Sequence, residues 1–133
     1  MINTMSSKTI LVVDDDSDYL FQLCFYLQKS GFKVISASSE KEALLSIDTA
    51  KPDLAILDLM MENEDSGFRL SYKLKRKYPE VPIIIATAVA SETGISFGLQ
   101  SGENMQWIKA DMYLEKGIHP DQMLAAVQKL LNK

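Results

Sequence analysis

Short apolar runs that alternate with amphipathic segments limit the fold of this chain more than any other feature of its sequence. Each run has the length of a strand that is buried on both faces of a parallel sheet. We expect five such strands, at residues 8–14, 32–37, 53–58, 81–87 and 111–115. Apolar residues recur at helical spacing in most of the intervening segments. This alternation predicts a parallel sheet with helices on both faces.

Residues typical of helix ends occur where this pattern needs them. Gly31 is placed to end the first helix in the left-handed conformation that glycine favours. Either Asp16 or Ser17 is placed to cap its first turn. Ser39 and Glu42 have the spacing of a capping box. We therefore expect helices over residues 17–30, 39–50 and 67–78, and a last helix with Pro120 in its first turn.

Length and composition indicate one ordinary globular domain. The chain has 133 residues and a net charge of −4; residues 8–133 are expected to form the domain, after a short flexible start at 1–7. Extended contact with nucleic acid needs a basic patch, which the sequence lacks. The single Cys24 excludes an internal disulfide, and no run reaches the roughly 18 apolar residues of a membrane span. We expect a cytoplasmic protein without direct contact to nucleic acid or membrane.

Acidic residues stand at the ends of two of the predicted strands. Asp14 and Asp15 follow the first strand, and Asp58 ends the third. In a flavodoxin-like, doubly wound sheet of order 2-1-3-4-5 these strands are neighbours, and ligands bind beyond their carboxyl ends. Carboxylates this close repel one another unless a cation neutralises them, and an all-oxygen cluster suits Mg²⁺. The alternative is that these acids merely end strands and cap helices.

Two further polar residues are expected at the same edge of the sheet. Thr87 ends the fourth strand with a hydroxyl, and Lys116 follows the fifth with an ammonium group. Each alone is ordinary, as a strand threonine or a surface lysine. Together with the acids they supply the parts for phosphoryl transfer to an aspartate, in which Asp58 would attack in line and Lys116 would neutralise charge.

The combination of motifs resembles the response regulator receiver family of two-component signalling, over most of the chain from about Lys8 onward. The resemblance rests on four segments, which are Val12-Val13-Asp14-Asp15, Asp58-Leu59-Met60-Met61, Ala86-Thr87-Ala88 and Tyr113-Leu114-Glu115-Lys116. It implies a regulator, not an enzyme, that accepts a phosphoryl group from a phosphohistidine. The donor would be a sensor histidine kinase or a phosphotransfer protein, and the output a changed surface for a downstream protein.

The resemblance also implies a role for each residue of the site. Asp58 would be the phosphoacceptor and, with Asp15 and the backbone carbonyl of Met60, a direct Mg²⁺ ligand. Asp14 would act on the metal through water. Thr87 and Lys116 would bind phosphoryl oxygens, and Thr87 would act with Tyr113 as the switch.

Several positions depart from the family pattern. Glu62 stands where the family usually has proline, and the turn at residues 65–67 is one residue longer than usual. Gly117 replaces a proline that is cis in the family. A cis bond costs about 2.5–4 kcal/mol without proline, so we expect a trans or mobile loop here.

The segment between Thr87 and Lys116 is longer than in the family and carries Gly94, Gly98 and Gly102. Glycine disfavours a helix interior by about 1 kcal/mol relative to alanine. We therefore expect an atypical, short or broken fourth helix at residues 90–108, with Trp107 packed near Tyr113.

Three other functions use similar residues and fit the sequence less well. A phosphatase of the haloacid dehalogenase class needs a threonine or valine where Asp18 stands, and a nucleotide binder needs a phosphate loop where the chain has Asp14-Asp15-Asp16. The remaining alternative is a receiver-like interaction scaffold that is not phosphorylated. Its usual mark is loss of the acceptor aspartate or of the lysine, and both residues are present.

Overall fold

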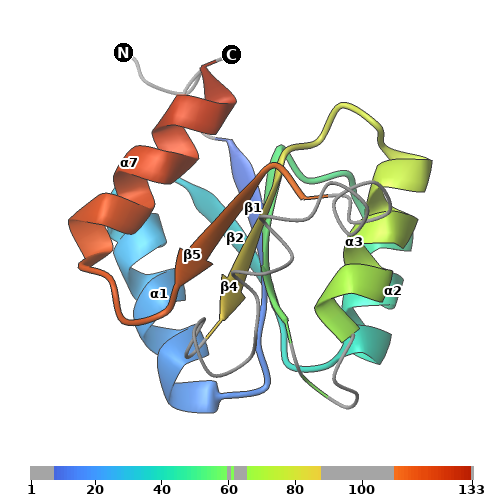
Figure 1. Ribbon diagram of the computed structural model, residues 1–133, viewed down its shortest axis with the longest axis horizontal. Coiled ribbons are helices and arrows are strands. Elements are labelled where there is room, and N and C mark those ends of the chain that lie inside the picture. Colours follow the sequence, from blue (N-terminus) through green and yellow to red (C-terminus); the bar gives the residue numbers. More distant parts are fainter. Residues whose placement is uncertain (1–7, 60, 62–65, 88–109, 133) are drawn as a thin grey trace, which may run out of the picture.

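A computed structural model describes residues 8–59, 61, 66–87 and 110–132 of the chain. Within these residues, five parallel strands form one sheet in the order β2-β1-β3-β4-β5 (Figure 1). The predicted doubly wound, flavodoxin-like order is confirmed. The strands are β1 (Thr9–Val13), β2 (Lys33–Ala37), β3 (Leu54–Asp58), β4 (Ile83–Thr87) and β5 (Met112–Glu115).

Helices cover both faces of this sheet. In Figure 1, α1 (Ser17–Lys29) and α7 (Pro120–Leu131) lie on one face, and α2 (Glu40–Thr49) and α3 (Ser66–Lys77) lie on the other. Every residue of β3 and β4 is buried, which explains why their sequences are apolar without alternation. Each face has its own core cluster, one built around Leu11, Leu57, Leu70 and Ile85, the other around Val12, Ile56, Leu27 and Val127.

The helix ends follow the predicted capping residues with one correction. Asp16 caps α1, because its carboxylate accepts hydrogen bonds from two backbone N–H groups of the first turn, and Gly31 has a φ of 102°. Ser39 accepts the N–H of Glu42 at 3.1 Å. The Glu42 carboxylate, however, accepts the N–H of Ser38 at 2.7 Å. The serine half of the predicted box is therefore present, while its glutamate half reaches one residue further back, to Ser38, since a glutamate is long enough to reach past the N-cap.

The remaining predictions concern the loop after β5 and residues outside the described ranges. The Lys116–Gly117 peptide bond is trans, since no cis bond occurs in the described residues. The flexible start at 1–7, the atypical fourth helix and Trp107 lie outside the described residues. No helix in the described part of the chain is long and apolar enough to cross a membrane.

Candidate functional site

The candidate site lies at the carboxyl edge of the sheet, where β1 and β3 end side by side. Val13 pairs with Leu57 in the parallel register, so Asp14 and Asp58 leave the two strands at the same level. The carboxylates of Asp14, Asp15 and Asp58 offer oxygens that all lie within 4.8 Å of one another. The convergence expected from the strand order is therefore present. Three carboxylates that supply only oxygen form a donor set that fits Mg²⁺.

The Asp58 carboxylate is buried beside groups of like charge. It is 5% exposed, and burial together with the charge of Asp14 raises its pKa from 3.8 to about 7, although Lys116 opposes the shift. The exposed Asp15 adds a smaller repulsion. Burial and like charge both disfavour the ionised form, and both would be relieved by a cation at this point.

Lys116 points its ammonium group into the acidic cluster. Its Nζ lies 2.6 Å from Oδ2 of Asp14 and 3.3 Å from Oδ1 of Asp58. Burial lowers the pKa of Lys116, but the bonds and charges of these two carboxylates outweigh it and leave the pKa raised. The backbone of Lys116 is also fixed, because its N–H donates to the carbonyl of Thr87 at 2.8 Å. The lysine is therefore a partly buried, positively charged partner of both acids.

Asp14 uses both of its carboxylate oxygens. Oδ1 accepts the backbone N–H of Asp16 at 2.8 Å, while Oδ2 receives Lys116. Its own N–H donates to the carbonyl of Ala37 at the end of β2. Asp14 is thus held in one orientation from two sides. Asp16, the third acid of the run, serves as the cap of α1, so the interpretation of these acids as helix caps holds for this residue.

The other predicted residues lie on the two strands beyond β3. Thr87 is buried at the end of β4, directly after Ala86, which pairs with Asp58. Tyr113 lies on β5 opposite Ile85 and packs against the cluster covered by α2 and α3. Its hydroxyl is buried and has no hydrogen-bond partner in the described residues, and burial raises the pKa of Tyr113 to about 12. Met60, the predicted source of a metal-binding carbonyl, lies outside the described residues.

Helix α3 is packed tightly against the strand that carries Asp58. The N–H of Gly67 donates to the carbonyl of Leu59 at 2.7 Å, and a Cβ at this position would lie 2.4 Å from the backbone oxygen of Asp58. Only glycine allows this approach.

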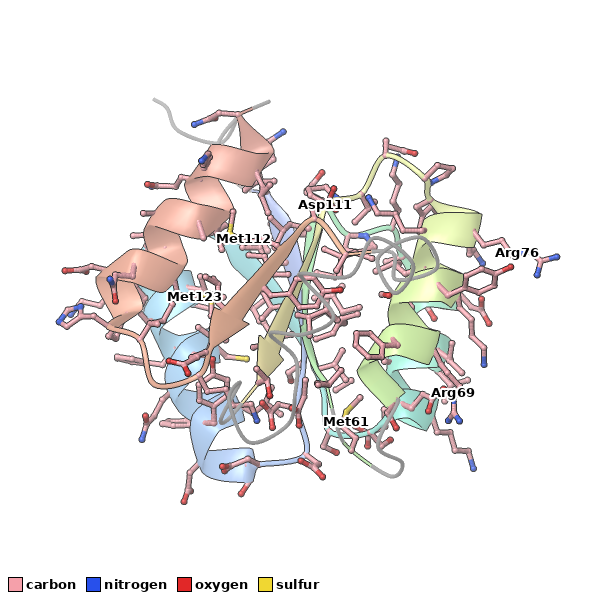
Figure 2. The ribbon with its side chains drawn as sticks, in the orientation of Figure 1. Met61, Arg69, Arg76, Asp111, Met112 and Met123 are labelled. Carbon is pink, nitrogen blue, oxygen red and sulfur yellow. The ribbon has the colours of Figure 1, made fainter. Side chains whose placement is uncertain are left out.

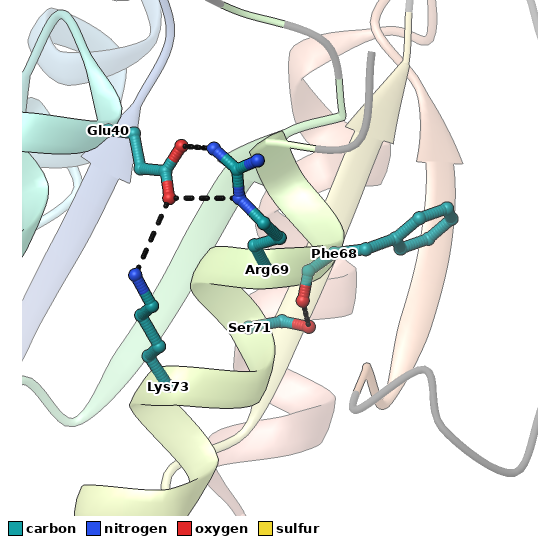
Figure 3. Close-up of polar contacts among 5 residues, drawn as sticks. All are labelled: Glu40, Phe68, Arg69, Ser71 and Lys73. Atoms are coloured by element: carbon teal, nitrogen blue, oxygen red, sulfur yellow. Dashed lines mark hydrogen bonds and ion pairs between the residues drawn. The ribbon is translucent and has the colours of Figure 1, made fainter. Parts of the chain in front are cut away.

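A network of charges also ties α3 to α2 (Figure 3). Arg69 donates to Glu40 at 2.6 Å, and Lys73 lies 3.9 Å from the same carboxylate. The buried Glu40 thus joins the first turns of α2 and α3, which follow β2 and β3, the strands on either side of β1. The network and Gly67 together set the position of α3 behind the site.

Sequence analysis missed one residue at this site, which is Tyr19 in the first turn of α1. Nζ of Lys116 lies 5.0 Å from the centre of its ring. Burial, followed by the charges of Asp14 and Asp58, raises the pKa of Tyr19 to about 12. The only signal in the sequence was its position five residues after Asp14, and this spacing does not reveal a partner in the loop after β5.

Comparisons with known proteins agree with this geometry. The family model of the response regulator receiver domain matches residues 10–128. The alkaline phosphatase synthesis transcriptional regulatory protein PhoP of Bacillus subtilis is 35% identical over 96% of this chain and 50% of its own length. The phosphate regulon transcriptional regulatory protein PhoB of Pseudomonas aeruginosa is 32% identical over 97% of this chain and 54% of its own length. This chain therefore spans about half the length of these relatives.

Solved structures show the same similarity. A CheY-like response regulator receiver domain protein from Methanospirillum hungatei superposes with a TM-score of 0.80 at 29% identity, over 96% of this chain and 95% of its own. The response regulator TrrA of Thermotoga maritima, solved in complex with Mg²⁺ and BeF, gives a TM-score of 0.76 at 30% identity, over 92% of this chain and 98% of its own.

Proposed function

Because this chain belongs to the response regulator receiver domain family, we propose that its Asp58 accepts a phosphoryl group in a Mg²⁺-dependent reaction. The observation that carries the proposal is the buried Asp58 carboxylate, which lies within reach of two further acids and 3.3 Å from the ammonium of Lys116. A carboxylate kept so close to like charges costs stability. Phosphoryl transfer to Asp58 would explain why the protein keeps these carboxylates together despite the cost in stability.

In the proposed reaction, a carboxylate oxygen of Asp58 attacks the phosphorus of a phosphohistidine in line with the leaving nitrogen. The O–P bond forms, the P–N bond breaks, and the electron pair of that bond leaves with the imidazole. A magnesium ion held by Asp14, Asp15 and Asp58, with the carbonyl of Met60, would supply positive charge to the phosphoryl oxygens. The Mg²⁺–BeF complex of the similar Thermotoga maritima protein supports this choice of metal.

The remaining residues follow from their places at the strand ends. Lys116 would exchange its contact with Asp58 for one with a phosphoryl oxygen while it keeps Asp14. Thr87, buried one residue beyond the neighbour of Asp58, would turn its hydroxyl to another phosphoryl oxygen. Tyr113 lies on β5 beside β4, and within the described residues no hydrogen bond holds its hydroxyl. Its side chain would therefore change position when Thr87 moves. These two residues form the proposed switch.

The partners of the protein belong to the same proposal. The donor would be a sensor histidine kinase or a phosphotransfer protein, and the phosphorylated surface would bind a downstream protein or domain. The relatives are named as transcriptional regulators and are about twice as long as this chain. Contact with nucleic acid by another part of a longer protein is therefore compatible with the proposal. The absence of such contact by this domain, and its cytoplasmic location, stay predictions.

The test is the intact mass of the protein after incubation with acetyl phosphate and Mg²⁺. We expect the wild type to gain one phosphoryl group, and we expect Asp58→Asn, or the wild type with EDTA, to gain none. Asp53→Asn, at the opposite edge of the sheet, is the matched control and should label normally. Labelling that survives in Asp58→Asn would refute the assignment, and a wild type that never labels would favour the unphosphorylated scaffold.

A further inference from the structure

The ring of Tyr19 contacts the Lys116 ammonium in addition to the two acids. Nζ lies 5.0 Å from the centre of the ring, within the roughly 6 Å at which a cation is attracted to an aromatic face. The same Nζ contacts Asp14 and Asp58 at 2.6 and 3.3 Å. The ammonium is thus held between two carboxylates and an aromatic ring that comes from a different element, α1.

A contact from another element matters for Lys116 because the residues next to it in the chain do little to fix its side chain. The residue directly follows β5, and a Cβ added at the next residue, Gly117, would meet nothing within 4 Å. Its backbone N–H is anchored on Thr87, but the four-carbon side chain beyond that anchor has many rotamers. Ordering a lysine side chain in one rotamer costs conformational entropy. A ring that favours one position of Nζ offsets part of that cost.

We propose that Tyr19 is a positioning residue for phosphoryl transfer, whose ring holds the Lys116 ammonium where it meets the Asp58 carboxylate. This inference rests on the proposed function of Asp58. The ring acts through Lys116 and does not need to touch the phosphoryl group. The phenol stays neutral beside the acids, since its pKa is raised to about 12, so it adds no further negative charge to the cluster.

The competing explanation is that Tyr19 only fills space. It packs against the core cluster between the sheet and the helices α1 and α7, and it lines a cavity with Lys116, Met123 and Ile118. A space-filling role would be served by any large apolar side chain, whether aromatic or not. A positioning role requires the ring and requires the lysine, which makes the two explanations separable.

The first experiment compares the rate of phosphorylation by acetyl phosphate in Mg²⁺ for three variants. Tyr19→Leu, which keeps the bulk but loses the ring, should be slower by about 2- to 30-fold, the value of one cation–π contact. Tyr19→Phe keeps the ring and should stay within about twofold of the wild type. Tyr26→Leu, seven residues along α1 and bonded through its hydroxyl to Asp121, is the matched control and should not change the rate.

The decisive comparison repeats the Tyr19→Leu change in a Lys116→Ala background. If the ring acts through the ammonium, the substitution has no further effect there. An equal loss in both backgrounds, or a Tyr19→Leu variant as fast as the wild type, would overturn the positioning role. A wild type that takes no phosphoryl group would overturn the proposed function and this role with it.

A second readout does not depend on phosphorylation. An aromatic ring above a lysine shifts the NMR signals of the adjacent ε-CH₂ protons upfield. We expect this shift for Lys116 in the wild type and in Tyr19→Phe, and its loss in Tyr19→Leu. Unshifted protons in the wild type would show that the contact is absent in solution, even if Asp58 is phosphorylated normally.

Discussion

The two edges of the sheet carry the same kind of residue and use it in opposite ways. At the carboxyl edge, Asp14 and Asp58 are buried together beside Lys116. At the amino edge, Asp53 and Asp111 are exposed and precede β3 and β5, which are separated by β4. Figure 2 shows the two edges, since Asp111 and Met61 lie at opposite ends of the sheet.

At the amino edge each aspartate completes a strand. The carboxylate of Asp53 accepts the N–H of Thr9 at 2.8 Å, and that of Asp111 accepts the N–H of Ile83 at 2.7 Å. Their own N–H groups donate to the carbonyls of the same two residues. Each aspartate thus pairs with the first residue of a neighbouring strand through two hydrogen bonds. These acids lower the free energy of the fold.

At the carboxyl edge the acids raise the free energy of the folded state. Asp58 is paired with Lys116 but also faces Asp14, and its raised pKa records the net cost. The number of aspartates at a strand end therefore says little about function. What separates the two edges is burial and the convergence of like charges, which a fold keeps only where they are used.

The largest expected effect on stability concerns how closely α3 approaches the carboxyl edge of the sheet. Gly67→Ala should lower the free energy of unfolding by about 3 kcal/mol, because the new Cβ would lie 2.4 Å from backbone atoms that cannot move aside. The gain of about 1 kcal/mol in helix propensity is too small to offset this. Urea unfolding measures the change. Gly117→Ala, which meets open space, is the control; equal stability of the two variants would refute the close packing.

The next largest effect on stability is expected from a variant at the amino edge of the sheet. Asp111→Ala should lower the free energy of unfolding by about 2 kcal/mol, since the buried N–H of Ile83 loses its carboxylate acceptor. Asp111→Asn keeps an acceptor oxygen and loses only the ion pair with Lys75 at 3.0 Å, so it should cost less than about 1 kcal/mol. If the asparagine variant is as unstable as the alanine variant, the ion pair and not the strand cap is the stabilising contact.

The smallest effect has the opposite sign. In EDTA at pH 8, Asp58→Asn should raise the free energy of unfolding by on the order of 1 kcal/mol, because it removes a charge that burial and Asp14 disfavour. Loss of the contact with Lys116 offsets part of the gain. Thermal unfolding of both proteins in the same buffer measures the difference. A lower melting temperature for Asp58→Asn would contradict the claim that this edge costs stability.

The Asp58 carboxylate also makes the free energy of unfolding depend on pH, in a direction that its raised pKa determines. The unfolded chain releases the Asp58 proton near pH 3.8, and the folded protein holds it until about pH 7. Between these values the folded state binds more protons, so the contribution of Asp58 to stability falls as the pH rises. Asp58→Asn should remove this contribution, and the two stability curves should diverge between about pH 4 and about pH 7. Parallel curves would refute the raised pKa.

Much of this fold was predictable because its strands and helix ends are local features. Buried runs such as residues 54–57 and 83–86 are apolar without alternation, and Gly31 is placed where only a left-handed residue fits. The acidic cluster was predictable as well, because parallel strands bring their carboxyl ends to one edge.

The contacts that the sequence did not reveal join distant elements. Tyr19 meets Lys116 only because α1 and the end of β5 lie on one side of the sheet, and no local pattern encodes that meeting. Asp111 was predicted as the first residue of a strand, whereas it caps β4 instead. The shift of the Glu42 contact to Ser38 likewise depends on the backbone path before α2.

The most direct test of the central claim locates the phosphoryl group itself. Sodium borohydride reduces an acyl phosphate to an alcohol, so a phosphorylated aspartate becomes homoserine, which peptide mass spectrometry identifies by position. After acetyl phosphate and Mg²⁺, we predict homoserine at position 58 alone, and none when Mg²⁺ is chelated. Homoserine at position 14 or 15, or at position 53 on the amino edge, would contradict the assignment of Asp58 as the phosphoacceptor.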